Sequence, residues 1–133
     1  MPRAIPPNVG HDDAFFWEGA AEGKLLLQRC ADCRTICHPP LPMCPVCQSL
    51  RHEPFAASGR GSIYSWIRSK HPTEPDAEPR IVVLVELEEG VRLVSNLRDT
   101  ALEDVHTGMA VQVVFDDLGG FIAPQFQPVV TGA

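Results

Sequence analysis

The chain has 133 residues, of which 44% are hydrophobic and 21% charged, and a formal net charge of −6. This length allows one compact domain or two small ones that share an interface. Residues 55–133 carry six basic against eleven acidic side chains, so this half lacks the basic surface on which phosphate-backbone binding depends. The most apolar run, residues 81–87, is far shorter than the ~18 apolar residues of a membrane span.

The first ten residues are rich in proline and are predicted to form a flexible arm. They have no apolar segment or cleavage pattern of a secretory signal, so we expect a soluble cytoplasmic protein. A helix should follow. Asp12 or Asp13 can accept hydrogen bonds from the free N–H groups of its first turn, and its end should fall between Gly19 and Gly23.

Three consecutive aromatic residues, Phe15, Phe16 and Trp17, lie in this predicted helix. Neighbouring residues cannot all face one side of a helix. One interpretation is that the rings form a docking surface for a partner, because exposed aromatic clusters often do. The other is that all three pack against the cysteine-rich segment that follows.

Four cysteines dominate the first half of the chain: Cys30, Cys33, Cys44 and Cys47. Two Cys-x-x-Cys pairs at this separation can place four thiolates around one tetrahedral Zn²⁺, and four protein ligands leave no open position for catalysis. A structural zinc is therefore predicted. Two disulfides would need an oxidising compartment, and a thioredoxin-like redox site would need only one such pair.

The fifth cysteine, Cys37, stands beside His38. It could replace a zinc ligand, but the favoured interpretation is a small thiol near the site. Residues 25–29 are predicted to form a strand that leads to the first cysteine pair. Residues 38–42 contain three prolines, which exclude a helix and suit the stiff outer loop of a zinc ribbon.

Short strands are predicted from Ser58 onward. Residues 61–68 alternate, which places two sets of side chains on opposite faces of a strand: Ile63, Ser65 and Ile67 on one, and Tyr64, Trp66 and Arg68 on the other. The polar, proline-rich residues 70–79 should form a long exposed loop.

The remaining pattern contains four more strands. Residues 81–87 and 91–96 flank a turn in which Gly90 allows a positive φ. Residues 100–103 fit a capping box, which predicts a short helix to about Val105. Strands over 110–115 and 121–127 follow. Five strands with a short helix between the third and fourth is the order of an OB-fold barrel, with Gly59 and Gly61 at a sharp bend of the first strand.

The predicted fold is therefore mainly β: a flexible arm over residues 1–10, an N-terminal helix with a rubredoxin-like zinc ribbon over 11–54, and a five-stranded OB-fold barrel over 55–133. No Ser/His/Asp set is recognisable. The histidines are scattered among predicted loops and element ends: His11, His38, His52, His71 and His106. The residues themselves therefore favour a non-catalytic role.

Several segments resemble a bacterial and archaeal zinc-ribbon/OB-fold family that is described as acyl-CoA-associated and was formerly a domain of unknown function. They run from Phe16-Trp17-Glu18-Gly19 through residues 23–30, 39–40, 44–47 and 58–66 to residues 91–96, 108–111 and 124–128. The chain departs from the family pattern at Arg34, where glycine usually follows the second cysteine, and at Leu41, where a basic residue often follows the two prolines.

This resemblance implies an accessory subunit of thiolase-fold enzymes or of hot-dog-fold enoyl-CoA hydratases. Such complexes carry out acyl-CoA condensation, acyl transfer or retro-aldol cleavage, including steroid side-chain breakdown. It further implies that the ribbon and the preceding helix dock the partner enzyme, and that the barrel lies near the substrate or CoA path.

Two other functions have support in the sequence. Tyr64 and Trp66 could stack the bases of a single-stranded nucleic acid, as OB folds do, although the acidic barrel half argues against it. A free-standing acyl-CoA binder would need cations for the CoA phosphates. The candidates for contact with either ligand are Arg60, Tyr64, Trp66, Arg68 and Lys70, with Arg80 as a further cation for CoA.

Overall fold

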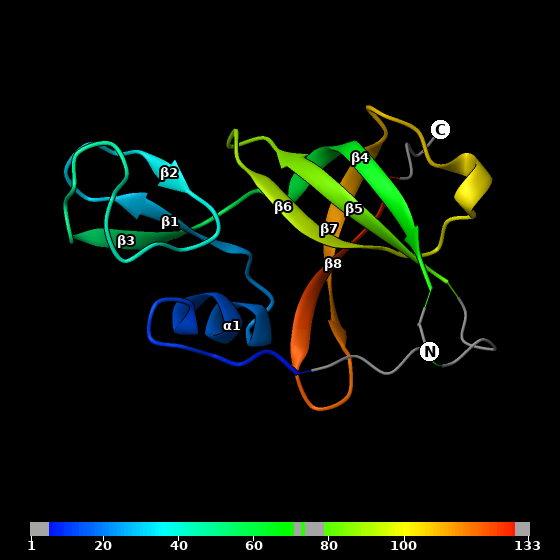
Figure 1. Cartoon of the computed structure of the whole chain (residues 1–133), viewed down its shortest axis with the longest axis horizontal. Coiled ribbons are helices and arrows are strands. Elements are labelled where there is room, and N and C mark those ends of the chain that lie inside the picture. The colour runs from blue at the N-terminus through cyan, green and yellow to red at the C-terminus, as the bar shows by residue number, and fades with distance from the viewer. Residues whose placement is uncertain (1–5, 71–72, 74–78, 130–133) are drawn as a thin grey trace.

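The computed structural model describes residues 6–70, 73 and 79–129. Its elements are α1 (Ala14–Ala21), β1 (Leu26–Cys30), β2 (Ile36–Cys37), β3 (His52–Ala56), β4 (Arg60–Ser69), β5 (Arg80–Leu87), β6 (Arg92–Leu97), the 3₁₀ turn η1 (Leu102–Asp104), β7 (Ala110–Asp117) and β8 (Ile122–Pro128). Figure 1 shows a small sheet with α1 beside it and a barrel next to both. Residues 1–5 of the predicted arm and most of the predicted loop over 70–79 lie outside the described residues.

The small sheet has the order β2-β1-β3, and both pairs are antiparallel. Its central strand β1 delivers Cys30 to the first cysteine pair, with His52 of β3 opposite. Leu27 of β1 is fully buried, whereas the side chains of β3 alternate between exposed and half-buried. The sheet therefore buries few apolar side chains, and Leu27 belongs to the same apolar cluster as the barrel core.

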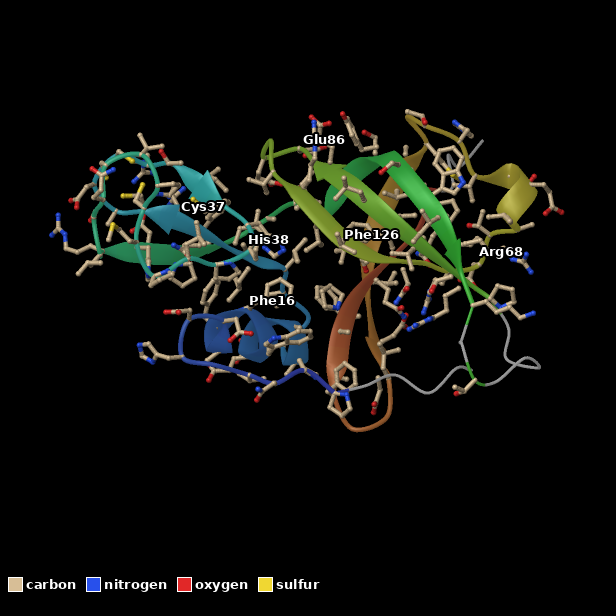
Figure 2. The ribbon with its side chains drawn as sticks, in the orientation of Figure 1. Phe16, Cys37, His38, Arg68, Glu86 and Phe126 are labelled. Carbon is tan, nitrogen blue, oxygen red and sulfur yellow. The ribbon has the colours of Figure 1, made fainter. Side chains whose placement is uncertain are left out.

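The second unit is a closed barrel with the strand order β4-β5-β6-β8-β7. β6 and β8 pair in parallel, and the other neighbours are antiparallel. This closure confirms the predicted five-stranded OB-fold barrel. Its interior is filled by aliphatic side chains around the fully buried Phe126, which Figure 2 labels inside the barrel.

The predicted alternation along β4 is wrong beyond Tyr64, because a β-bulge shifts the register. Ile63 pairs with Val85, but Ser65 pairs with Leu84, so one extra residue reverses which side chains face inward. Ile63 is therefore buried while Ile67 is 63% exposed, although the pattern placed both on one face. Trp66 instead packs against the core.

Both predicted helix caps are also wrong in detail. Asp13 occupies the N-cap of α1 without a side-chain capping bond; its carboxylate accepts from Gly10 N and from Trp17 Nε1. The predicted capping box yields only the three-residue turn η1, which has no side-chain cap, because the Thr100 hydroxyl donates to the carbonyl of Arg98. Short polar side chains often prefer such local partners.

Two glycines fit where β4 begins. Gly59 has a φ of 82°, a conformation that side chains other than glycine rarely adopt. At Gly61 a Cβ atom would lie 2.5 Å from the carbonyl oxygen of Glu86, so a larger residue would push β4 away from β5. The hairpin turn between β5 and β6 contains Gly90 at a φ of 91°, as predicted.

Candidate metal centre and adjoining cleft

The two cysteine pairs form loops with the same hydrogen bonds. Cys30 N donates to Thr35 O at 2.8 Å, and Cys44 N donates to Ser49 O at 2.9 Å. In each loop the residue after the second cysteine donates back to the first cysteine's carbonyl at 3.0 Å. Two loops of equal geometry thus present four sulfurs to one point.

The residues that close these loops are Arg34 and Gln48, with φ values of 70° and 61°. This left-handed conformation costs a non-glycine residue roughly 1–2 kcal/mol. It explains why glycine usually stands at the position of Arg34 in the family pattern. The loop keeps its shape here despite the substitution.

The sulfur atoms of Cys30, Cys33, Cys44 and Cys47 all lie within 4.8 Å of one another, and two of the pairs are 3.5 Å apart. A tetrahedral zinc with Zn–S bonds of about 2.3 Å separates its sulfurs by about 3.8 Å. The donor set and its spacing therefore fit a structural zinc ion. These four residues would fill its coordination sphere.

The electrostatics of the four thiols also favour a cation. A hydrogen bond with the Thr35 hydroxyl lowers the pKa of Cys33 to about 6. The N–H of Ser49 lowers the pKa of Cys47, but hydrogen bonds with Cys30 and Cys33 outweigh it and raise this pKa to about 12. Four adjacent thiolates cannot all form without a positive charge between them, which a bound metal ion supplies.

Side chains outside the cysteines brace this centre. Asp32 of the first loop accepts from Ser49 and Arg51 after the second, and the hydrogen bond with Arg51 lowers the pKa of Asp32. Buried Gln28 pairs with the backbone of Leu41: its Nε2 donates to Leu41 O at 2.8 Å, and Leu41 N donates to its Oε1 at 2.9 Å. Gln28 thereby fixes the proline-rich loop to β1.

Gln28 was not predicted, because a single glutamine in a strand carries no recognisable signal. Its location directly after three leucines and two residues before Cys30 was the available hint. Cys37 lies outside the four-sulfur group. Burial raises the pKa of its thiol, which agrees with the favoured interpretation of a small thiol near the site.

The three helix aromatics pack inward to different degrees. Phe16 is 7% exposed, and Phe15 and Trp17 are half-buried against the core. Phe16 contacts Trp17 and His38, with ring centroids 5.1 and 5.5 Å apart, and Trp17 meets Phe121 at 6.2 Å. Figure 2 shows Phe16 and His38 at the junction of helix, ribbon and barrel. Phe16 therefore has a packing role, and docking by its neighbours stays a prediction.

The five residues that were predicted to contact a ligand do not lie together at one site. β4 spans Arg60 to Ser69, so Arg60 and Arg68 lie on the order of 25 Å apart at about 3.3 Å per residue, and Lys70 follows the strand. Arg60 pairs with Glu88 at 2.9 Å. Figure 2 shows Arg68 at the barrel end far from the ribbon.

Tyr64 and Trp66, the two rings that could stack nucleic-acid bases, differ in their exposure to solvent. Tyr64 is 47% exposed and lies beneath Arg92, whose guanidinium is 3.8 Å from the ring centroid. Trp66 packs against the core. The two rings therefore do not form one exposed platform for stacking bases.

A cleft of about 490 Å³ opens where the start of α1, the segment His38–Pro40 and strands β6 and β8 meet. Its walls include Asp12, Trp17, His38, Val94 and Asn96. Its volume falls within the range of ligand pockets, roughly 300–1,000 Å³. The cleft was not predicted, because it exists only where helix, ribbon and barrel come together.

Two family models match the chain: "ChsH2, rubredoxin-like zinc ribbon domain" over residues 17–53 and "ChsH2, C-terminal OB-fold domain" over residues 56–116. A solved structure described as "Ltp2-ChsH2(DUF35) aldolase" contains a chain with 41% identity and a TM-score of 0.88. The match covers 94% of this chain and 100% of that one. This chain belongs to the ChsH2/DUF35 family.

Two curated relatives extend this finding. A "Probable enoyl-CoA hydratase alpha subunit" of Thermomonospora curvata is 42% identical over 97% of this chain, but the chain spans only 42% of that protein. A "DUF35 domain-containing scaffold protein" of Pyrococcus furiosus is 32% identical over 69% of this chain and 74% of its own length. The family thus includes both longer hydratase subunits and short scaffold proteins.

Proposed function

We propose that this chain is a non-catalytic accessory subunit that docks onto a separate enzyme of acyl-CoA metabolism. The observation that carries the proposal is the likeness to a whole chain of an aldolase whose description names two components, Ltp2 and ChsH2(DUF35). A module that matches one component from end to end is well suited to serve as the corresponding component of a similar complex.

The described residues support a non-catalytic role. The four cysteines would saturate a zinc ion, which leaves no position for a reacting water or substrate. Among residues 6–70, 73 and 79–129, no histidine hydrogen bonds to a serine, threonine or cysteine side chain; the His106 ring has a hydrogen bond with a backbone carbonyl. A nucleophile activated by a base would need such a contact.

The descriptions of the relatives suggest the chemistry of the partner. A solved relative is described as an aldolase, and a curated one as a probable enoyl-CoA hydratase alpha subunit. We assign the catalysis to a partner enzyme: a thiolase-fold enzyme in the first place, and a hot-dog-fold hydratase in the second. Condensation, acyl transfer or retro-aldol cleavage in lipid or steroid metabolism would be its reaction, with acyl-CoA as the ligand of the complex.

The two parts of the chain have different proposed roles. The helix and the zinc ribbon, residues 11–54, would dock the enzyme, and the barrel, residues 55–133, would lie beside its substrate path. No helix among the described residues is long and apolar enough to cross a membrane.

The test is purification of the tagged chain from its native host, followed by mass spectrometry of any stoichiometric partner. The proposal predicts recovery of a thiolase-fold or hydratase-fold enzyme. The Cys44→Ser variant, which should lose the zinc and the shape of the ribbon, should recover much less of it. Recovery of nucleic acid, or of no partner, would contradict the proposal.

A further inference from the structure

The cleft between helix, ribbon and barrel has an acidic rim. Asp12 and Asp13 lie at the start of α1, and none of the lysines or arginines that the structure describes lines the cleft. The N-terminal end of a helix carries the positive end of its dipole, so this part of the rim is where carboxylates are commonly found. Asp12 makes no hydrogen bond or ion pair to any residue that the structure describes, so its charge is available to a partner.

Aromatic and ring-shaped side chains form one wall of this cleft. The indole of Trp17 is held by a hydrogen bond from Nε1 to Asp13 Oδ2 at 3.3 Å and by edge contacts with Phe16 and Phe121. His38 stacks at a tilt on Phe16, and its buried Nδ1 has no hydrogen-bond partner among the described residues. Burial lowers the pKa of His38, so the ring adds no positive charge to the wall near neutral pH.

The opposite wall belongs to the barrel and is mainly apolar. Leu93 and Val94 of β6 and Ala123 and Pro124 of β8 line it, and Val94 is 67% exposed. Such a surface suits the aliphatic stem of a long cationic side chain, which packs on apolar groups while its charged head finds a carboxylate.

We infer that this cleft receives an arginine-bearing loop of the partner enzyme, with the guanidinium between Asp12 and the ring of Trp17. The inference rests on the proposed function, because it needs an enzyme partner. Arginine suits the site better than lysine, since its planar guanidinium both stacks on aromatic rings and pairs with carboxylates. The phosphates of CoA do not suit it, because the described residues of its walls include two carboxylates and no lysine or arginine.

The first test measures the affinity of the chain for the partner enzyme recovered with it, by isothermal titration calorimetry. Asp12→Lys should weaken binding at least tenfold. Glu103→Lys makes the same change of charge on an exposed residue of η1, outside residues 11–54 and outside the cleft, and should change the affinity less than threefold. Equal effects of the two variants, or tighter binding by Asp12→Lys, would overturn the inference; the latter would indicate an acidic occupant.

The second test identifies the occupant directly. A photo-crosslinking residue at Val94, on the rim of the cleft, is compared with one at Ile67, which is equally exposed on β4 outside it. The inference predicts crosslinks from position 94 to an arginine-containing loop of the partner, and far fewer from position 67. Crosslinks from position 94 to a second copy of this chain, or to a partner segment without arginine, would overturn it.

The two proposals fail in different ways. If no enzyme is recovered with the chain, the proposed function is contradicted and this inference with it. If the enzyme is recovered with unchanged affinity for Asp12→Lys and no crosslink from position 94, the accessory function stands and only the assignment of the cleft is wrong.

Discussion

The zinc ribbon and the barrel lie side by side in one small chain, yet different forces hold them. The barrel encloses a continuous apolar core that includes fully buried Val85, Val111 and Phe126. The ribbon has few apolar side chains of its own, and its loops are held by backbone hydrogen bonds around four sulfurs. Small domains with little core often depend on metal ions in this way, so each unit should fail under a different perturbation.

The largest effect should come from the metal centre. Cys44→Ser removes one of four thiolate ligands, and structural zinc contributes an apparent ~10–16 kcal/mol of binding free energy in zinc-finger peptides. We expect the ribbon to unfold while the barrel persists. Zinc content per chain and ¹H–¹⁵N correlation spectra would show it. A folded ribbon without zinc would contradict this account of the centre.

The barrel should respond to loss of core volume. Phe126→Ala deletes a fully buried ring and should lower the free energy of unfolding of the barrel by about 3–5 kcal/mol. Urea unfolding monitored by circular dichroism measures this change, with Ile67→Ala at an exposed position as the control. Zinc should stay bound while the barrel unfolds. Loss of zinc in the same transition as the unfolding of the barrel would mean that the two units are one cooperative structure.

Substitution of Gln28 tests whether the ribbon depends on hydrogen bonds between a side chain and the backbone. Gln28→Ala leaves the N–H and carbonyl of Leu41 without their partner, which should cost about 1–3 kcal/mol. Faster amide hydrogen exchange at Leu41 and easier removal of zinc by a chelator are the expected signs. Unchanged exchange at Leu41 would show that the proline-rich loop is held by other contacts.

A substitution at Arg34 should increase the stability of the ribbon, in contrast to the three substitutions above. Arg34→Gly removes a side chain from a left-handed residue and should stabilise the zinc-bound ribbon by up to about 1 kcal/mol. Chelator competition would measure it. Arg34→Ala is the control, because it removes the ion pair with Glu53 but keeps the strained backbone. An equal gain in stability with Arg34→Ala would show that loss of the side chain, and not relief of the backbone strain, causes the effect.

The smallest effect concerns a surface ion pair of the barrel. The hydrogen bond from Arg60 lowers the pKa of Glu88, so the pair adds stability above the unfolded-state pKa of glutamate, about 4.3. This contribution disappears as pH falls through the lowered pKa. Glu88→Gln should therefore be slightly less stable than the wild type at pH 7, and this difference in stability should shrink as pH falls below the ordinary pKa of glutamate. A difference in stability that grows as pH falls would contradict the direction of this shift.

The sequence predicted the parts of the chain with strong local signals. The cysteine spacing predicted one tetrahedral group of sulfurs, and the order of strands predicted the OB-fold barrel. Both follow from residues close together in the chain or from a repeating pattern. The ends of the strands differ from the prediction by one or two residues, as expected where hydrogen bonds fray.

The errors arise where contacts distant in sequence decide the structure. The bulge after Ile63 depends on the pairing of β4 with β5, which no alternation within residues 61–68 records. Asp13 and Thr100 have capping side chains but use them for other partners. The cleft beside Trp17 needs four separate segments of the chain, so local patterns could not predict it.

We propose that this chain supports the catalysis of a partner enzyme and has no acyl-CoA activity of its own. Acyl-CoA turnover by the partner enzyme, measured as the zinc-loaded chain is added, tests this proposal. We expect no turnover by the chain alone, and a rate that rises with added chain and saturates at a fixed stoichiometry. Turnover by the chain alone, or a partner rate independent of the chain, would contradict it.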